Sequence, residues 1–402
     1  MSVIARFGKD ALDKGFAACF GGLPRRYFSA PGRTELGGNH TDHQHGRVLA
    51  AAVDCDTVAA VRKNDTHEIR VLSQGYSLCR IDLGTLCPVD EERGTTAALI
   101  RGVAAGFSRL APIGGFDAYV MSTVLPGSGL SSSAAFEVLM GTVLNHLFCG
   151  GQVSPTEVAQ IGQQAENWFY GKPCGLMDQL ASAVGGCVQI DFETTPPQVC
   201  PVSFDFGNCG YGLCIINSGG NHENLTPEYA AVTEELKAVC HHFGAEVLRQ
   251  VDEQAFYREL PLLRDKCGDR AVLRAIHVFE ENRRVTAQAA ALEKGDFQTF
   301  LELVSQSGRS SWMYLQNVIP TGAVAHQELA LTLALCDPLL QGRGACRVHG
   351  GGFAGTVQAF VPLDLLEDFR ANITAVLGPE SCQILHLHPQ GGRELHFPTT
   401  CE

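Results

Sequence analysis

Apolar and polar residues of this chain follow two different periods, and each period predicts a different kind of element. Runs rich in β-branched and aromatic residues predict strands at 48–53, 57–61, 69–72, 116–124, 187–192, 211–216, 357–361 and 383–387. Apolar positions three or four residues apart predict helices at 10–20, 94–110, 135–143, 156–170, 270–293, 296–307 and 322–335. Asn64-Asp65 is expected to form a hairpin turn between the second and third strands.

The length and composition indicate a folded protein of more than one domain. Because 402 residues exceed the size at which one hydrophobic core usually stops growing, two domains are expected. Hydrophobic residues make up 45% of the chain and charged residues 18%, which is typical of a globular protein. The formal net charge of −13 argues against binding to nucleic acid, which usually needs a basic face. A small-molecule partner is expected instead.

The sequence predicts no membrane partner and a cytoplasmic location. No run approaches the roughly 18 consecutive apolar residues of a membrane helix. Asp10 and Asp13 lie too near the start for a signal peptide. The 16 cysteines are spread from Cys19 to Cys401 without a Cys-x-x-Cys pair, which disfavours a zinc site or a redox dithiol. Reduced thiols in a cytoplasm are therefore expected.

A glycine- and serine-rich loop at 125–133 lies between a predicted strand and a predicted helix. Gly127 and Gly129 allow the backbone to turn with positive φ, and Ser131 to Ser133 stand where a helix begins and its first amides lack partners. Such a junction forms a cradle for an anion. Unlike a Walker loop, it has no Lys-Ser or Lys-Thr after the second glycine, so hydroxyls and backbone amides would hold the phosphate and its metal. An ordinary glycine turn with a serine cap is the alternative.

Residues 27–46 form a second loop, in which polar side chains gather. Between Arg33 and Gly46 it holds Arg, Glu, Asp and three His, and loops with so many polar side chains are more often functional than packed. A solvated turn is one alternative. Another is a metal site, whose ligands would be His40, Asp42, His43 and His45, although no helical frame fixes them.

Two further segments carry candidate chemistry. Glu166 falls near the end of the predicted helix 156–170, and Asp178 stands in the first turn of the next helix. An acidic residue there can simply complement the helix dipole. Residues 350–352, all glycine, precede a strand, and glycines so dense suit a backbone that lies close to a ligand or to another loop.

Together these loops resemble the motifs of the small-metabolite kinases, the family of galactokinase, homoserine kinase, mevalonate kinase and phosphomevalonate kinase. The resemblance rests on Pro31-Gly32-Arg33 with His40-Thr41-Asp42, on Pro126-Gly127-Ser128-Gly129-Leu130-Ser131-Ser132-Ser133-Ala134, and on Gly350-Gly351-Gly352-Phe353. The first loop is similar to the galactokinase signature, and Pro173-Cys174-Gly175-Leu176-Met177-Asp178-Gln179 is similar to the catalytic segment of that branch. The likeness runs from about residue 20 to about residue 365.

The resemblance implies an α/β (α+β) fold of two domains with the active site between them. Residues 1–205 would form a ribosomal-S5-like N-terminal domain, and residues 206–402 a ferredoxin-like C-terminal domain. The implied activity is the ATP-dependent phosphorylation of galactose at its C1 hydroxyl by a monomeric enzyme, with ATP and Mg²⁺ as cofactors. Two alternatives stay open: a kinase for a related sugar such as N-acetylgalactosamine, and a catalytically silent sensor that binds sugar and ATP.

The resemblance also implies a role for each matching residue. The ATP phosphates would lie against Gly127, Ser128, Gly129, Leu130, Ser131, Ser132 and Ser133. Ser133 and Glu166 would bind Mg²⁺. Asp178 would accept the proton of the attacking sugar hydroxyl, and Arg33 would stabilise charge on the transferring phosphoryl group. The sugar would lie against Asn39, His40, Thr41, Asp42, Gly175 and Tyr229.

The chain departs from the galactokinase pattern at four positions. Glu35 stands where the pattern has Asn, Asn39 where it has Glu, His43 where it has Tyr, and Ala354 where it has Gly. These departures bear on the identity of the sugar more than on the reaction.

Overall fold

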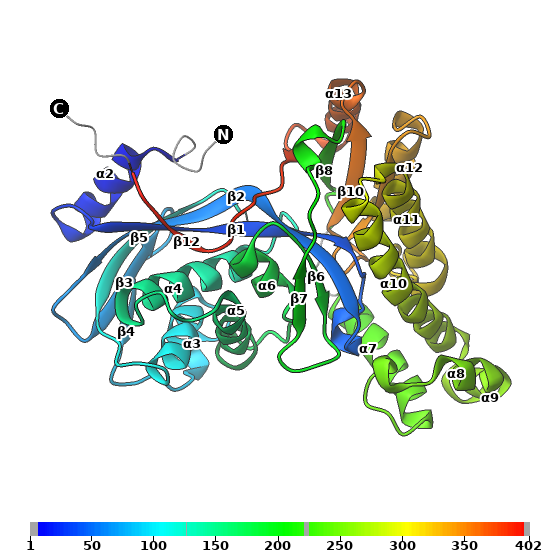
Figure 1. Ribbon diagram of the computed structural model, residues 1–402, viewed down its shortest axis with the longest axis horizontal. Coiled ribbons are helices and arrows are strands. Elements are labelled where there is room, and N and C mark those ends of the chain that lie inside the picture. The colour runs from blue at the N-terminus through cyan, green and yellow to red at the C-terminus, as the bar shows by residue number, and fades with distance from the viewer. Residues whose placement is uncertain (1–6, 126, 221–224, 398–402) are drawn as a thin grey trace. The chain divides into compact units, whose positions relative to one another are not determined.

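The structure is a computed structural model that describes residues 7–125, 127–220 and 225–397 (Figure 1). The chain divides into two compact units that interleave along the sequence. Unit 1 consists of Met1–Arg33, Ala52–Gly186 and His388–Glu402, and unit 2 consists of Thr34–Ala51 and Cys187–Leu387. The contiguous domains 1–205 and 206–402 stay a prediction.

Unit 1 is built on a sheet with helices on both faces. The strand order is β12 (Arg393–Leu395), β1 (Arg26–Gly37), β2 (Arg47–Lys63), β5 (Phe116–Ser122), β3 (Glu68–Ser73) and β4 (Cys79–Asp82). On one face lie α3 (Thr96–Ser108), α4 (Ser132–Phe148), α5 (Pro155–Gln164) and α6 (Met177–Val184), and on the other lies α2 (Lys9–Phe20) (Figure 1). The short elements of this unit are η2 (Asp90–Glu92) and η3 (Ala165–Tyr170).

The alternation of side chains along β5 explains why helices cover both faces of this sheet. Tyr119 and Met121 pack with Leu12 and Phe16 of α2. Successive residues of a strand point to opposite faces, so the intervening positions of β5 face the other helices. One strand therefore contributes to two apolar layers.

Unit 2 contains a four-stranded antiparallel sheet in the order β11 (Cys382–Leu385), β8 (Tyr211–Asn217), β10 (Thr356–Pro362) and β9 (Ala345–His349). The beginning of β2 pairs with β6 (Cys187–Asp191), which pairs with β7 (Gln198–Pro201). The helices are α7 (Thr226–His242), α8 (Glu253–Arg258), α9 (Leu260–Cys267), α10 (Asp269–Glu293), α11 (Phe297–Ser310), α12 (Glu328–Leu339) and α13 (Leu366–Leu377). Shorter turns are η1 (Asp42–Gln44), η4 (Phe206–Asn208), η5 (Leu248–Gln250) and η6 (Ser311–Leu315).

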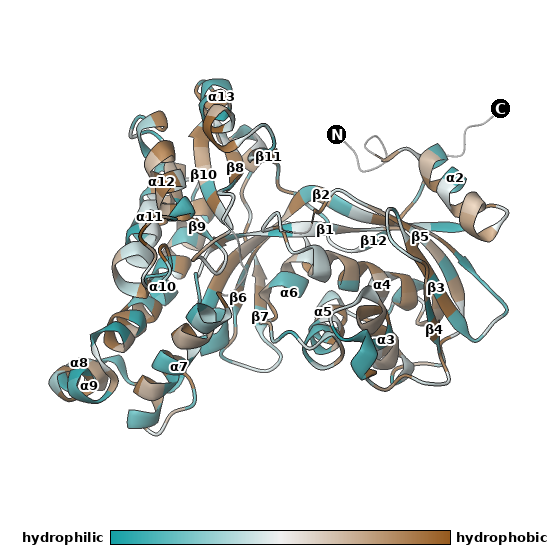
Figure 2. Cartoon of the chain, turned by 180° about the vertical axis from the view of Figure 1, so that it is seen from behind, coloured by the Kyte–Doolittle hydropathy of each residue, from teal (hydrophilic) through white to brown (hydrophobic). Residues whose placement is uncertain are grey.

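Strand β10 lies at the centre of the unit 2 core, and Figure 2 shows hydrophobic residues along it and along β8. Val357, Ala359 and Val361 belong to a buried cluster with residues of α12 and α13. Phe360, on the opposite face, contacts two phenylalanine rings of α11. The sheet is therefore covered by helices on both faces.

The sequence predicted most of these elements but misplaced some. The helix expected at 270–293 is confirmed as α10. The hairpin at Asn64-Asp65 is wrong, because β5 lies between β2 and β3 and pairs with both. The strands expected at 48–53 and 57–61 are one continuous strand, β2. The loop expected at 27–46 is wrong over its first part, because residues 27–37 lie in strand β1.

Candidate active site

The glycine- and serine-rich loop of unit 1 has the backbone that an anion cradle requires. Gly127, Gly129 and Ser131 have positive φ values of 76°, 75° and 58°, and α4 begins directly afterwards. The Ser131 side chain makes no capping hydrogen bond within the described part of this turn, so the first amides of α4 are open to a ligand oxygen. Pro126 of the same motif lies outside the described residues.

A cavity of about 430 Å³ lies beside this loop, entirely within unit 1. Ser132 and Ser133 line it at the loop end. The rest of the lining is Thr57, Ser73, Gln74, Tyr76, Gly94, Thr96, Leu99, Val120, Ser122, Val124, Leu125, Phe136 and Tyr170. An apolar and aromatic lining with a few hydroxyl and amide groups is typical of a small-molecule pocket.

This pocket was not predicted from the sequence. Its walls come from β2, β3, β5, α3, α4 and η3, and apart from Ser132 and Ser133 no short motif marks them. The sequence offered one signal for the pocket, which is that several lining residues lie in the strand before the serine loop or in the helix after it.

Arg33 and Asp178, expected to be catalytic, are bound to each other. Arg33 Nε donates to Asp178 Oδ1 at 2.6 Å, and Arg33 Nη2 donates to Asp178 Oδ2 at 2.7 Å. Arg33 Nη1 donates to the carbonyl of Gly129 at 2.5 Å, which ties the pair to the serine loop. A two-pronged contact of this kind fixes both side chains in one geometry. Asp178 lies in the first turn of α6, where Ser182 Oγ donates to Pro31 O at 2.6 Å and joins that helix to β1.

The ionisation of Asp178 is decided by these neighbours. Burial acts to raise its pKa, but the charge and hydrogen bonds of Arg33, with a hydrogen bond from Ser131, outweigh burial and hold the pKa below its usual range. Asp178 is therefore an ionised carboxylate at neutral pH, and it does more than complement the dipole of α6.

Glu166 is the centre of a second polar cluster in unit 1. It lies on η3, a π-helical turn, an irregularity that is frequent at functional sites. Its carboxylate accepts hydrogen bonds from Ser133 Oγ at 3.0 Å, from Gln179 Nε2 at 2.9 Å and from Cys174 Sγ at 3.1 Å. Lys172 Nζ lies 3.4 Å from Glu166 Oε1. A carboxylate and a hydroxyl in contact are suitable oxygen ligands for Mg²⁺, which binds through one or two carboxylates together with substrate phosphates.

A second carboxyl group is buried behind Glu166. The Gln179 amide also donates to Glu137 Oε2 at 2.9 Å, so Gln179 bridges Glu137 and Glu166. Burial, and then the charge of Glu166, raise the pKa of Glu137 well above its usual value. Burial and Glu166 likewise raise the pKa of the Cys174 thiol. Glu137 was not among the residues expected to be functional.

In unit 2, the loop 38–46 is held in shape by its own side chains. Thr41 is buried, and its hydroxyl donates to the carbonyls of Gly38 at 2.8 Å and Arg47 at 2.5 Å. His40 Nδ1 lies 3.1 Å from His43 Nε2, and His40 Nε2 lies 2.9 Å from Gly351 O. Burial, then the charge of His43, lower the pKa of His40 to about 3, so its ring is neutral. Asp42 begins η1 and is partly exposed.

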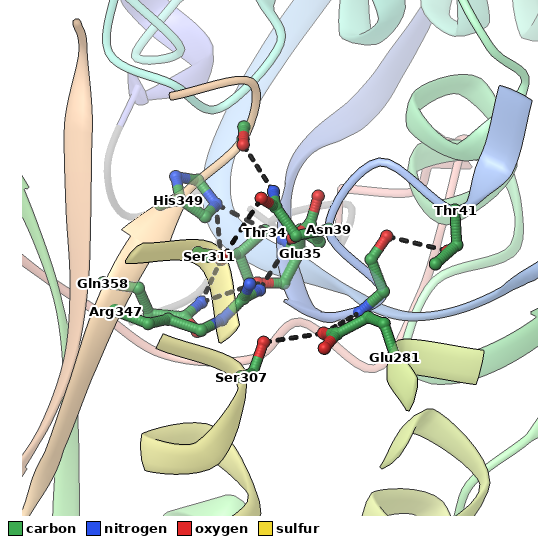
Figure 3. Close-up of polar contacts among 12 residues, drawn as sticks. Thr34, Glu35, Asn39, Thr41, Glu281, Ser307, Ser311, Arg347, His349 and Gln358 are labelled. Atoms are coloured by element: carbon green, nitrogen blue, oxygen red, sulfur yellow. Dashed lines mark hydrogen bonds and ion pairs between the residues drawn. The ribbon is translucent and has the colours of Figure 1, made fainter. Parts of the chain in front are cut away.

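The same loop belongs to a buried polar network within unit 2 (Figure 3). Asn39 is completely buried and contacts Glu35, Ser311 and Asn317 through its side chain. Tyr229 Oη donates to Gly352 O at 2.9 Å, and burial raises the pKa of Tyr229 to about 12. In the described residues, no group of three or more His, Cys, Asp or Glu side chains is arranged to hold a metal ion.

The structure thus brings the expected residues together in two sets. Unit 1 holds Arg33, Gly127, Ser128, Gly129, Leu130, Ser131, Ser132, Ser133, Glu166, Gly175 and Asp178. Unit 2 holds Asn39, His40, Thr41, Asp42 and Tyr229. Gly175 follows Cys174, whose backbone amide donates to Asn167 Oδ1 at 2.7 Å.

Known proteins share both the motifs and the fold. Residues 98–186 match the N-terminal domain of the GHMP kinases, and residues 14–63 match the galactokinase galactose-binding signature. A Lactococcus lactis galactokinase, solved in complex with galactose, has a TM-score of 0.80 at 25% identity, covering 96% of this chain and 99% of that chain. Methanococcus jannaschii mevalonate kinase has a TM-score of 0.64 at 13% identity, covering 91% and 99%. Streptococcus pneumoniae phosphomevalonate kinase has a TM-score of 0.61 at 12% identity, covering 92% and 100%.

The chain therefore carries a GHMP kinase N-terminal domain and the galactokinase galactose-binding signature, and its mixed α/β fold confirms the class that the sequence resemblance implied. The signature and the structural likeness to a galactokinase show a sugar kinase of the galactokinase type. Across the described ranges, no helix combines the length and the apolar character needed to cross a lipid bilayer.

Proposed function

We propose that this protein transfers the γ-phosphoryl group of ATP to the C1 hydroxyl of galactose, giving galactose 1-phosphate and ADP. The observation that carries the proposal is the Arg33–Asp178 fork fastened to the carbonyl of Gly129 in the serine loop. It supports the proposal because an ionised carboxylate and a fixed cation lie beside the serine loop, where we propose that phosphate binds.

The roles follow from what phosphoryl transfer requires. A loose transition state needs positioned oxygens and charge neutralisation more than covalent help. Residues 127–133 bind the phosphates through backbone amides and hydroxyls, and the adjacent cavity accepts the purine. Arg33 stabilises the charge on the transferred group. Ser133 and Glu166 would hold Mg²⁺, which would supply further neutralisation of the phosphate oxygens.

Asp178 orients the sugar hydroxyl and accepts its proton. As the bond between the sugar oxygen and the γ-phosphorus forms, the bond from that phosphorus to the β,γ-bridging oxygen breaks, and the hydroxyl proton passes to Asp178. Because its pKa is below the usual range, Asp178 is a weak base that takes the proton late in the transfer. Orientation of the hydroxyl is therefore a large part of its contribution.

For the sugar we propose contacts with His40, Asp42, Gly175 and Tyr229. Each of these residues is partly exposed, whereas Asn39 and Thr41 are buried and hold the shape of their loop. The net charge of −13 supports a small-molecule substrate, and 16 cysteines without a Cys-x-x-Cys pair support a reducing cytoplasm. We propose that the enzyme acts there as a monomer.

The test is an assay of ADP release by the purified protein with Mg²⁺-ATP and a panel of sugars. Galactose is expected to give the highest kcat/KM, with glucose and N-acetylgalactosamine well below it. A higher kcat/KM for N-acetylgalactosamine would overturn the choice of sugar. ATP binding without turnover of any sugar would overturn the proposed activity and favour the silent sensor.

A further inference from the structure

The Asn39 side chain uses its whole hydrogen-bonding capacity inside the protein (Figure 3). Its Nδ2 donates to the carbonyl of Gly350 at 2.5 Å and to Glu35 Oε1 at 3.3 Å. Its Oδ1 accepts from Asn317 Nδ2 at 2.9 Å and from Ser311 Oγ at 3.4 Å. A carboxamide has two donor hydrogens and two acceptor lone pairs, so no capacity is left for a ligand. The residue is 0% exposed.

Glu35 is fixed just as firmly, by a buried cation. Arg347 Nη2 donates to Glu35 Oε1 at 2.8 Å and also to the Glu35 carbonyl at 2.9 Å. The Arg347 side chain is 0% exposed and that of Glu35 is 5% exposed. Removing one partner of a buried pair leaves an uncompensated charge, which is strongly destabilising. The carboxylate at position 35 is therefore the counter-ion that Arg347 requires.

The contacts of Asn39 also hold the glycine loop of residues 350–352. Asn39 donates to the first carbonyl of that loop, Asn317 Nδ2 donates to the second at 3.2 Å, and Tyr229 Oη donates to the third at 2.9 Å. Three successive carbonyl groups are thus held by side chains from three different segments. Asn39 joins this loop to Glu35, because its one amide nitrogen donates to both.

We infer that Glu35 and Asn39 act as one pair that positions the glycine loop of residues 350–352 beside the loop of residues 38–46. Asn39 is then a positioning residue and not a sugar ligand. One member of the pair carries the negative charge and the other must donate hydrogen bonds. A carboxylate at position 39 would face the Glu35 carboxylate and the Gly350 carbonyl, two groups that can only accept.

The test is a double-mutant cycle in which side-chain shape is kept and the charge is moved. The variants are Glu35→Gln, Asn39→Asp and the double variant Glu35→Gln/Asn39→Asp in the full-length protein. Melting temperature is measured without ligand, and kcat, galactose KM and ATP KM are measured by ADP release. The KM measurements rest on the proposed function, whereas the melting temperatures test the pair even if galactose is not the substrate.

Asn39→Asp is expected to lower the melting temperature by roughly 5 °C or more, because it sets two carboxylates together in the interior. Galactose KM should rise about tenfold through the displaced loop, with ATP KM changed less than about twofold. The double variant should lose less stability than the sum of the two single variants and should recover part of the galactose KM. The reason is that the amide introduced at position 35 can donate to the carboxylate introduced at position 39. If the variant were only less stable, a smaller fraction of the protein would be active, and the KM values for galactose and ATP would not change by different factors.

Asn145→Asp is the matched control. Asn145 is buried, and both ends of its amide are hydrogen-bonded to the backbone of Val153. Combining it with Glu35→Gln should give additive losses. If Asn39→Asp does not fold, Asn39→Ala replaces it; that change adds no charge, so Glu35→Gln should not rescue it.

Three results would overturn the inference. The first is additive losses in the Glu35–Asn39 cycle. The second is a changed galactose KM in Asn39→Asp with an unchanged melting temperature, which would make Asn39 a sugar ligand. The third is rescue of Asn39→Ala by Glu35→Gln, because charge would then not be the basis of the coupling.

Discussion

The ionisation state of individual residues in this enzyme depends on burial and on the charge of one or two neighbours. Asp178 is ionised because Arg33 outweighs the effect of burial, while Glu137, buried beside the charge of Glu166, has its pKa raised. His40 is neutral because it is buried beside His43. The same kind of side chain thus has different ionisation in different places, which residue identity alone does not reveal.

Asp178→Asn tests the carboxylate that we propose as the proton acceptor. The amide keeps the shape of the side chain, but it cannot take the hydroxyl proton and it loses its ion pair with Arg33. We expect kcat to fall by about 10²- to 10⁴-fold, the range typical of a lost general base. Galactose binding, measured by calorimetry, should change much less. Turnover at the parent rate would remove Asp178 from the chemistry.

Arg33→Lys tests the fork, because a point charge replaces a planar group that donates two parallel hydrogen bonds. With the fork lost, the pKa of Asp178 should rise toward its usual range. Since the ionised carboxylate is the active form, the acid limb of the pH profile of kcat/KM should move to higher pH. The value of kcat at neutral pH should also fall. An unchanged acid limb would show that Arg33 does not set the ionisation of Asp178.

At the scale of elements, the sequence predicted helices with a regular apolar period. It did not predict which strands pair, because strand pairing depends on residues far apart in the sequence. Helix α10 was predicted almost to the residue because its apolar stripe is long and regular. The hairpin at residues 64–65 was wrong because Asn64 bonds to β5 instead, donating through Nδ2 to Asp117 Oδ1 at 2.8 Å. A turn signal says that the chain reverses, but it does not say which strand lies alongside.

The π-helical turn of Glu166 was also beyond sequence reasoning. The period of residues 156–170 predicted one helix, yet α5 ends at Gln164 and η3 follows. This irregular turn joins the helix to the segment that carries Cys174. The contacts that accompany it come from Ser133 and Gln179 on other elements, and no local pattern contains them.

Glu137→Gln tests the buried carboxyl that α4 places behind Glu166. The folded pKa of Glu137 lies well above its ordinary value of 4.5. Its stabilising contribution is therefore fully present below that value and is lost as the pH rises through the folded pKa. Glutamine has the same shape and no proton to lose, so the variant's melting temperature should fall less than the parent's, by a few °C, between acid and slightly alkaline pH.

The exposed Glu302→Gln serves as the control for this comparison, and it should follow the parent at every pH. Parallel melting curves for the parent and Glu137→Gln across the same range would contradict the raised pKa of Glu137.

At the scale of the whole molecule, the family was predictable because several weak motifs occur in one order. Neither the serine loop nor the glycine cluster is specific alone, but together with the loop around His40 they indicated the family. The structural likeness to a galactokinase covers 96% of the chain, and two family models match residues 98–186 and 14–63. The interleaving of the two units was not predictable, because β1 and β2 each begin in one unit and end in the other. The cavity beside the serine loop was missed because its walls come from six separate elements.

Ligand binding should stabilise the whole protein whether or not the sugar is turned over. A ligand that binds the folded state stabilises it by about 2.7 kcal/mol at a concentration one hundred times its Kd. Galactose should therefore raise the melting temperature by several °C in both the parent and Asp178→Asn, since the variant loses proton transfer and not the sugar site. Glucose, as the matched control, should give a clearly smaller shift at equal concentration. If galactose shifted the parent and left Asp178→Asn unmoved, Asp178 would be needed for sugar binding itself, and its assignment as proton acceptor would have to be replaced.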